Sequence, residues 1–294
     1  MKNLIVVTGG AGFVGSNLID LLIKKTKYKI YSIDNYSTGK KKNHISNKRV
    51  KYIRNNTKNI SKILNSKKKN IKAIFHFGEF ARIYQSFSSM NECIDSNSVG
   101  SHEVFNFCFV NKIKLIYSAT SASIGNDGKD KNLSPYAFTK SKNLELLENY
   151  KKWFGMKYEI IYFYNVYGPK QIKSGKMATV IGIFENQFKN KKYLTVVKPG
   201  SQSRRFTHVN DTINACYFAF KRNKNRHYSI SHKKSYSILE VAKMFSNKIK
   251  FLTKRPGERY ASALTSMHLS NKVYKLHGKI DLKNYINSIK KQLK

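Results

Sequence analysis

Cysteine is scarce in this sequence, and the few cysteines present do not form a recognisable site. The 294 residues include three, Cys93, Cys108 and Cys216. An odd number of widely spaced cysteines with apolar neighbours argues against a disulfide framework. No Cys, His or Asp cluster has the spacing of metal ligands. We therefore expect three buried thiols in a reducing, cytoplasmic environment, and we predict no metal site.

Long apolar runs are also missing. The first run, residues 4–7, breaks at Gly9 and Gly10 before the hydrophobic region of a signal peptide could form. No other run approaches the length needed to cross a membrane. With 40% hydrophobic residues, the chain can still bury a core as one large domain or two joined ones.

Acidic residues are few. The chain has 16 Asp and Glu residues against 56 Lys and Arg residues, which gives a formal charge of +40. Such a charge raises encounter rates with anionic ligands and promotes loose binding to nucleic acid. The lysine runs lack the interleaved motif of a nucleic-acid module. We therefore interpret the charge as a solvated coat and predict no specific nucleic-acid partner.

The first 34 residues carry the clearest functional pattern. A short apolar strand runs into TGGAGFVGSNL, an amphipathic helix follows, and a second strand ends at Asp34. Gly10, Gly12 and Gly15 satisfy G-x-G-x-x-G, and Gly9 begins the related G-x-x-G-x-x-G pattern. These glycines allow a tight turn and close approach of the backbone to a pyrophosphate at the helix N-terminus. Asp34 has the spacing to bind the adenosine ribose, and its charge favours NAD over NADP.

Apolar strands alternate with helical patterns over the first two thirds of the chain. This alternation predicts an α/β fold with a doubly wound parallel Rossmann sheet. We expect an NAD-binding domain over 1–167, rejoined by about 203–232, and a smaller mixed substrate-binding lobe formed by 168–202 and 233–294. The predicted strands lie near 3–7, 29–33, 50–53, 72–76, 113–118, 158–164 and 194–197, and the predicted helices near 13–25, 58–66, 92–110 and 135–152.

A second pattern, Ser134-Pro135-Tyr136-x-x-x-Lys140, lies at the start of the last of these helices. Serine as N-cap and proline at the first helical position begin a helix, so Tyr136 and Lys140 lie one turn apart on the same face. The ordinary tyrosine pKa of about 10 is high for a base, but a neighbouring ammonium and a cationic nicotinamide favour the phenolate. Lys140 would also reach the nicotinamide ribose. Tyr-x-x-x-Lys is common by chance, but its position after the glycine pattern favours a catalytic pair.

The chain resembles the extended short-chain dehydrogenases/reductases, and specifically the nucleotide-sugar epimerase/dehydratase family. The resemblance extends from Met1 to the last helix. It implies the fold described above, NAD as cofactor, a nucleotide-sugar substrate, and a homodimer joined by the helices near 92–110 and 135–152. The matching segments are TGGAGFVGSNL, SIDNYSTGK, IFHFGE, SNSVGSHEV, SATSASIG, SPYAFTK, YFYNVYGP, GSQSRRFTHVND and KRPGE.

The resemblance also implies a reaction. Thr120 takes the place of the family's catalytic Ser or Thr, while Ser121 and Ala122 replace the acid and base of the 4,6-dehydratases, which disfavours elimination of water. What remains resembles UDP-glucose 4-epimerase chemistry. Tyr136 would accept the proton of the sugar 4-hydroxyl, hydride would pass to NAD and return to the other face, and Thr120 would hold the 4-oxygen. The alternatives are a nucleotide-sugar reductase or dehydrogenase, an epimerase of a GDP- or dTDP-sugar, and a non-catalytic nucleotide- or nucleic-acid-binding module.

Further positions follow from the same resemblance. Asn165, Arg204 and Arg255 match residues that hold the nucleotide diphosphate. Arg205 replaces the usual Asp of its motif and Glu79 replaces a small residue beside the expected nicotinamide pocket, and these departures leave the sugar open. The complete predicted NAD site comprises Gly9, Gly12, Phe13, Val14, Gly15, Asp34, Asn35, Asn56 and Lys140.

Overall fold

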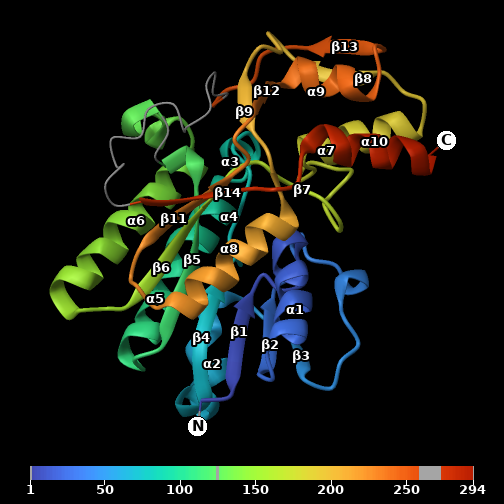
Figure 1. Cartoon of the computed structure of the whole chain (residues 1–294). Helices are drawn as coiled ribbons and strands as arrows, with labels where there is room; N and C mark the ends of the chain where they lie inside the picture. The colour runs from blue at the N-terminus through green and yellow to red at the C-terminus, as the bar shows by residue number, and fades with distance from the viewer. Residues whose placement is uncertain (1, 124–125, 258–272, 294) are drawn as a thin grey trace.

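The computed structural model describes residues 2–123, 126–257 and 273–293. Its centre is an eight-stranded sheet with strand order β14-β11-β6-β5-β4-β1-β2-β3, in which every pairing is parallel (Figure 1). The predicted doubly wound Rossmann sheet is thus confirmed. Its strands are β1 (Leu4–Thr8), β2 (Lys29–Asp34), β3 (Val50–Arg54), β4 (Ile71–His76), β5 (Lys114–Thr120), β6 (Tyr158–Phe163), β11 (His227–Ser231) and β14 (Val273–His277).

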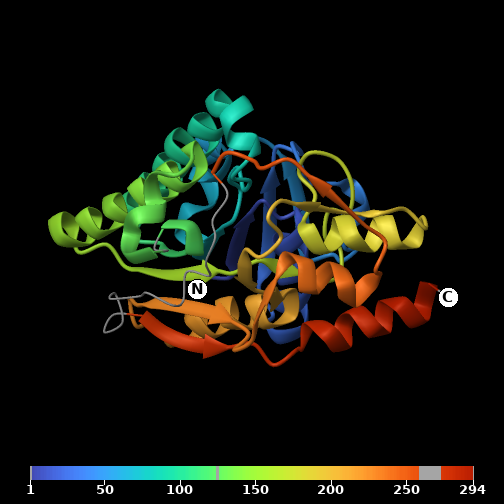
Figure 2. The same ribbon diagram turned by 90° about the horizontal axis from the view of Figure 1, so that it is seen from above.

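Helices cover both faces of this sheet, as the view from above shows (Figure 2). One face packs against α1 (Phe13–Lys25) and α8 (Val209–Arg222), through residues such as Leu18 and Ile213. Residues such as Phe105 and Leu147 join the helices of the second layer to the other face. This layer comprises α2 (Ile60–Leu64), α4 (Met90–Ile94), the π-helical turn η4 (Asp95–Gly100), α5 (Ser101–Val110) and α6 (Pro135–Phe154). Because both faces are covered, a strand such as β1 is apolar and buried along most of its length.

The strand order places a crevice at one edge of the sheet. Strand β1 lies between β4 and β2, so the chain winds outward in opposite directions from the β1–β4 boundary. Ligands of open parallel sheets bind at such a switch point, beyond the carboxyl ends of the strands. The glycine-rich loop after β1 and the loop after β4 both start there.

A smaller group of elements lies above that edge in Figure 1. Helices α7 (Val180–Lys189), α9 (Ile238–Phe245) and α10 (Leu282–Leu293) and strands β8 (Leu194–Val197) and β13 (Ile249–Leu252) share a second core that includes Phe184 and Ile286. Strands β9 (Ser203–Arg205) and β12 (Ser235–Ser237) pair as a short antiparallel ribbon. Strand β14 joins the main sheet, although it comes from the range 233–294 that we assigned to the smaller lobe. The division into two domains remains a prediction, and part of the second, residues 258–272, lies outside the described residues.

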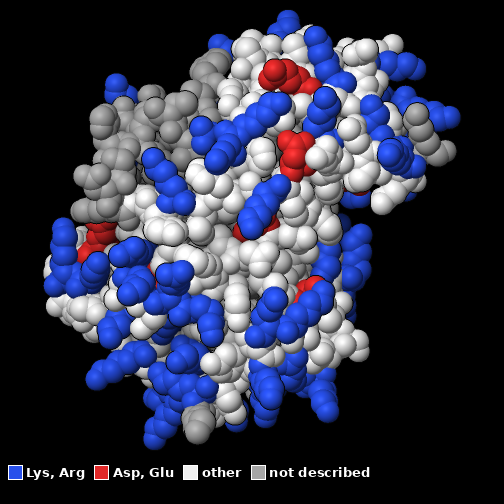
Figure 3. All heavy atoms as spheres, in the orientation of Figure 1, with Lys and Arg blue, Asp and Glu red and all other residues white. Residues whose placement is uncertain are grey.

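Basic side chains are prominent on the surface of the protein. Lys and Arg side chains cover much of the face shown in Figure 3, with few Asp and Glu side chains between them. The three cysteines are free and buried, as expected. No helix among the described residues is long and apolar enough to cross a membrane.

Candidate active site

The glycine-rich loop is folded tightly against the loop that follows β4. Gly9 has a φ of +69°, and a Cβ there would lie 2.8 Å from the backbone carbonyl carbon of Phe77. A Cβ at Gly15 would lie 2.2 Å from the carbonyl oxygen of Gly9. A Cβ at Gly12 would approach only the Gly9 carbonyl oxygen, at 3.1 Å. Gly9 and Gly15 therefore fix the turn, while Gly12 is the position with open space for a ligand to approach the backbone.

Helix α1 presents its N-terminus at this opening. Gly12 is its N-cap with extended backbone, and the first turn contains no acidic residue. The amides of the first turn, including those of Phe13 and Val14, have no intrahelical acceptor, and such a terminus binds phosphate groups. The loop and the helix together fit the pyrophosphate of a dinucleotide.

Asp34 lies next to the glycine loop in the candidate NAD site. Its carboxylate is buried and accepts hydrogen bonds from the backbone amides of Ala11 (3.0 Å) and Tyr36 (2.8 Å). Burial raises the pKa of Asp34, and these amides partly offset the increase. The carboxylate is thus attached to the glycine loop at the end of β2, where the ribose of a dinucleotide is expected.

Two other predicted cofactor residues are engaged in local turns. The exposed Asn35 side chain accepts a hydrogen bond from the amide of Ser37 (3.0 Å). The Asn56 side chain accepts one from the amide of Lys58 (3.0 Å) and caps a short helical turn. Their roles toward NAD stay predictions.

Tyr136 lies at the first turn of α6, which begins as the sequence indicated. The Ser134 hydroxyl accepts a hydrogen bond from the amide of Ala137 (3.1 Å), and Pro135 follows the cap. Thr120, at the end of β5, lies close enough to the Tyr136 phenol to lower its pKa. The structure therefore brings the predicted base and the predicted hydroxyl residue together at the carboxyl edge of the sheet.

The charges around the phenol are of both signs. Burial raises the pKa of Tyr136 to about 12. The nearby Thr120 hydroxyl and the positive charge of Arg82 lower this pKa, whereas the negative charge of Glu79 and the Cys93 thiol raise it. Without bound ligands, the phenol is therefore protonated at neutral pH.

Lys140, which we expected to act on Tyr136 as a neighbouring ammonium, forms a buried ion pair with Glu79. Its Nζ also donates a hydrogen bond to the carbonyl oxygen of Ser118 (2.5 Å) and lies 4.3 Å from the centre of the Tyr117 ring. Burial lowers the pKa of Lys140, and the Glu79 carboxylate opposes that shift.

Arg82 is a residue that sequence reasoning missed. It follows β4 by six positions, and its Nε and Nη2 donate hydrogen bonds to the carbonyl oxygen of Met177 (2.9 and 2.6 Å). It therefore connects the loop after β4 to the segment before α7, and it faces Tyr136. A basic residue shortly after a strand that ends at the ligand edge was the available signal.

The predicted diphosphate-binding residues lie on separate segments. Asn165 is exposed, has a φ of +38°, and donates a hydrogen bond to the carbonyl oxygen of Arg205 (2.9 Å), beside Arg204 in β9. The guanidinium of Arg255 lies 5.1 Å from the centre of the Tyr84 ring. The structure thus joins Asn165 to the Arg204 strand and places Arg255 beside the loop that leads to α3 (Gln85–Ser88).

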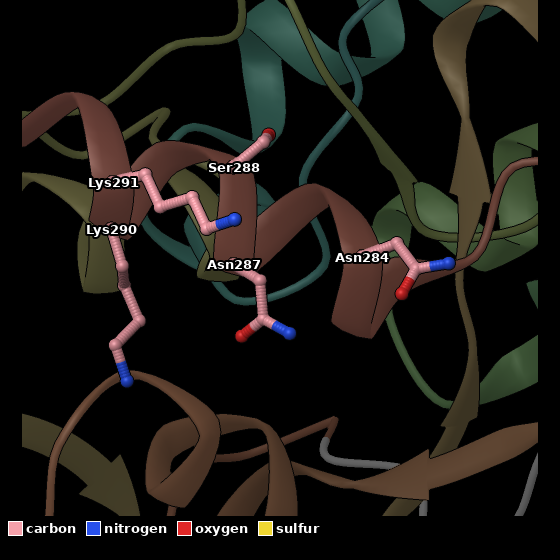
Figure 4. Close-up of a pocket in the computed structure, with 5 residues that line it drawn as sticks. All are labelled: Asn284, Asn287, Ser288, Lys290 and Lys291. Carbon is pink, nitrogen blue, oxygen red and sulfur yellow. The ribbon is translucent and has the colours of Figure 1, made fainter.

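Two surface depressions lie away from these residues. One, of about 490 Å³, runs along α10 and is lined by Asn284, Asn287, Ser288, Lys290 and Lys291, all from a single helix (Figure 4). The other, of about 1080 Å³, lies at the amino-terminal ends of the strands, with Lys2 and Lys114 among its lining residues. Since parallel sheets bind ligands at the opposite edge, the region of Tyr136 and the glycine loop is the candidate active site.

Comparison with known proteins places the chain in a family. Residues 5–231 match the model of the NAD dependent epimerase/dehydratase family. A putative UDP-glucose 4-epimerase of Methanocaldococcus jannaschii is 27% identical over 260 residues, which cover 84% of this chain and 83% of that protein.

Solved structures agree with this assignment. The UDP-N-acetylglucosamine 4-epimerase of Methanobrevibacter ruminantium, in complex with UDP-N-acetylmuramic acid, is 26% identical with a TM-score of 0.84, covering 100% of this chain and 98% of that one. The UDP-glucuronic acid 4-epimerase of Bacillus cereus, in complex with UDP-glucuronic acid and NAD, is 26% identical with a TM-score of 0.84, covering 99% and 100%. The chain therefore belongs to the NAD-dependent epimerase/dehydratase family, and its cofactor is NAD.

Proposed function

We propose that this protein is a UDP-hexose 4-epimerase. The observation that carries the proposal is the contact between Tyr136 and Thr120 at the ligand edge, beside a glycine loop suited to a dinucleotide. Relatives that are 26% identical over nearly their whole length were solved with UDP-sugars, which supports a UDP-linked substrate.

In the proposed reaction, Tyr136 accepts the proton of the sugar 4-hydroxyl and later returns it. Thr120 holds the 4-oxygen and stabilises the carbonyl that develops there. Arg82 supplies positive charge next to the phenolate. Bound NAD supplies a hydride acceptor that gives the hydride back within the same turnover. Arg204 and Arg255 bind the diphosphate, for which guanidinium groups are well suited, and Asn165 assists them.

The residues after Thr120 favour epimerisation over dehydration. Ser121 and Ala122 are buried directly beyond β5, where the 4,6-dehydratases carry their acid and base. Neither side chain has a carboxylate to donate or accept the protons of an elimination.

A panel of nucleotide sugars tests this proposal. The purified protein is incubated without added cofactor with UDP-glucose, UDP-N-acetylglucosamine, UDP-glucuronic acid, a dTDP-hexose and a GDP-hexose, and products are separated by chromatography. We expect interconversion of C4 epimers of a UDP-sugar with no net change in NADH. In a parallel incubation with added NADH or NADPH, stoichiometric use of either cofactor would instead identify a reductase or dehydrogenase. Turnover restricted to the dTDP- or GDP-sugar would refute the UDP assignment.

We also propose a homodimer through the α4–η4–α5 and α6 layer. Four large apolar side chains on these helices are 43–48% exposed. A second copy would cover them, because a pair of helices from each subunit forms a four-helix interface. Other apolar positions of these helices, such as Val104 and Leu147, are buried in the core against the sheet. The exposed side chains are Met90, Ile94, Val99 and Phe138.

The double variant Ile94→Asp/Phe138→Asp is expected to convert a dimer into a monomer, because it places charge in the centre of the apolar face. Light scattering after size exclusion measures the mass. Tyr193→Asp, at a 63% exposed aromatic outside this face, is the control and should stay dimeric. A monomeric unmodified protein would contradict the proposal.

A further inference from the structure

A buried carboxylate lies beneath the proposed catalytic residues. The Glu79 and Lys140 side chains are 3% and 4% exposed. Glu79 follows β4, whereas its partners come from α5, β5 and α6, so four segments converge on one carboxylate. Its Oε1 accepts hydrogen bonds from the Ser101 hydroxyl (2.8 Å), the Tyr117 hydroxyl (2.9 Å) and the Asn143 amide (3.1 Å), while Lys140 binds Oε2.

The hydrogen bonds around Glu79 all run in one direction, from the neighbouring groups toward the carboxylate. Because Ser101 donates to Glu79, its oxygen accepts from His76 Nε2 (2.9 Å), which leaves His76 Nδ1 to accept from the Thr8 hydroxyl (2.7 Å). This pattern requires a neutral imidazole, and burial lowers the pKa of His76 to about 4. Ser101, Tyr117, Asn143 and Lys140 therefore all donate to the Glu79 carboxylate, whose two oxygens serve only as acceptors here.

The ion pair with Glu79 reduces the number of N–H donors that Lys140 has for a ligand. An ammonium has three protons, and Lys140 directs one to Glu79 and one to the Ser118 carbonyl oxygen. One proton remains for a ligand. The lysine is thus fixed in position, and its charge is matched by a carboxylate of the same burial.

Tyr136 faces charged or titratable groups from several elements. Glu79 and Arg82 come from the loop after β4, Cys93 from α4, and Tyr117 from β5, while Lys140 lies one turn along α6. Glu79 offsets one of the two cations in this set. Removing its charge would leave Arg82 and Lys140 both unopposed.

We propose that Glu79 is a positioning residue that holds Lys140 and balances its charge, so that Tyr136 keeps its proton until a further cation enters the site. The inference rests on the proposed function for its catalytic consequence. The Glu79–Lys140 ion pair on which it is built does not depend on which sugar is the substrate.

The test compares Glu79→Gln with the unmodified protein. Glutamine keeps the shape and one acceptor oxygen but removes the charge. Phenolate absorbance is titrated in each protein and in its Tyr136→Phe counterpart, and the difference gives the pKa of Tyr136 without any substrate. We expect Glu79→Gln to lower this pKa by about one unit, because a nearby anion disfavours the phenolate. The alkaline rise of activity should move to lower pH by the same amount.

Glu159→Gln is the matched control. Glu159 is also a fully buried carboxylate with a lysine partner, Lys114 at 3.3 Å, and it lies near the start of β6, away from Tyr136. Its replacement should leave the Tyr136 titration unchanged. An unchanged titration in Glu79→Gln, or an equal shift in Glu159→Gln, would overturn the inference.

A second comparison covers the case in which Glu79→Gln does not fold. Glu79→Gln/Lys140→Gln removes both charges and leaves none buried and unpaired, so it should keep the pKa of Tyr136 near the starting value. A shift of about one unit or more in this double variant would refute the charge balance. If the sugar panel shows no turnover, the proposed function fails, but these titrations still decide the role of Glu79.

Discussion

Tyr136→Phe is expected to lower turnover of the nucleotide sugar by about 10²–10⁴-fold, because general acid–base catalysis contributes a factor of this size. Phenylalanine keeps the aromatic ring but has no hydroxyl to exchange a proton with the substrate. Binding of NAD should be retained, since the glycine loop and Asp34 are untouched. The measurements are kcat on the active sugar and NAD affinity by calorimetry.

The pH dependence of the unmodified enzyme gives a second readout of the same residue. Since the pKa of Tyr136 is raised to about 12 in the protein without ligands, the phenolate fraction at neutral pH is small and grows with pH. Activity limited by this group should therefore rise from neutral toward alkaline pH, and the rise should be absent in Tyr136→Phe. Tyr162→Phe, which removes another buried phenol, one paired with His227 (3.0 Å), is the control and should keep full activity. Wild-type turnover in Tyr136→Phe would show that another residue is the base.

Lys140→Met is expected to lower the free energy of unfolding by about 3–5 kcal/mol, in addition to abolishing activity. The substitution leaves Glu79 buried without its counter-charge, and an unpaired buried ion is strongly destabilising. Urea unfolding measures the effect. Glu79→Gln/Lys140→Met should recover most of the loss, because no buried charge remains.

An exposed lysine on the same helix provides the comparison. Lys142 pairs with Glu145 at 2.7 Å, and both side chains are about half exposed. Lys142→Met should therefore cost less than about 1 kcal/mol, as is typical of surface ion pairs. Equal effects of Lys140→Met and Lys142→Met would mean that the buried pair contributes no more than a surface one.

The sheet could be predicted from the sequence because its strands are buried on both faces. Predicted strands near 72–76 and 158–164 became β4 (Ile71–His76) and β6 (Tyr158–Phe163), since continuous apolar runs mark such strands directly. The start of α6 was equally predictable, because Ser134 is its N-cap and Pro135 occupies its first position. Strand β14 was not predicted, because only one of its five residues is buried and its sequence lacks an apolar run.

The electrostatics of the site were less predictable. Glu79 was noted in the sequence as a departure beside the nicotinamide pocket, but its partner Lys140 is 61 residues away, and no local pattern joins the two. Arg82 lies in a loop without regular periodicity, so its proximity to Tyr136 depends on how β4 and α6 pack. Local sequence motifs predicted the candidate catalytic residues Thr120, Tyr136 and Lys140. Tertiary packing determined which charges surround them.

The excess of lysine on the surface produces electrostatic repulsion within the folded protein. Six ion pairs join described residues, and in three of them the carboxylate side chain is no more than 10% exposed. With a formal charge of +40, the folded chain concentrates mutual repulsion that the unfolded chain can relieve by expanding. Dissolved salt shortens the range of that repulsion to about 8 Å at physiological strength. Added salt should therefore raise the stability of the folded state by screening this repulsion, although it weakens the individual surface ion pairs.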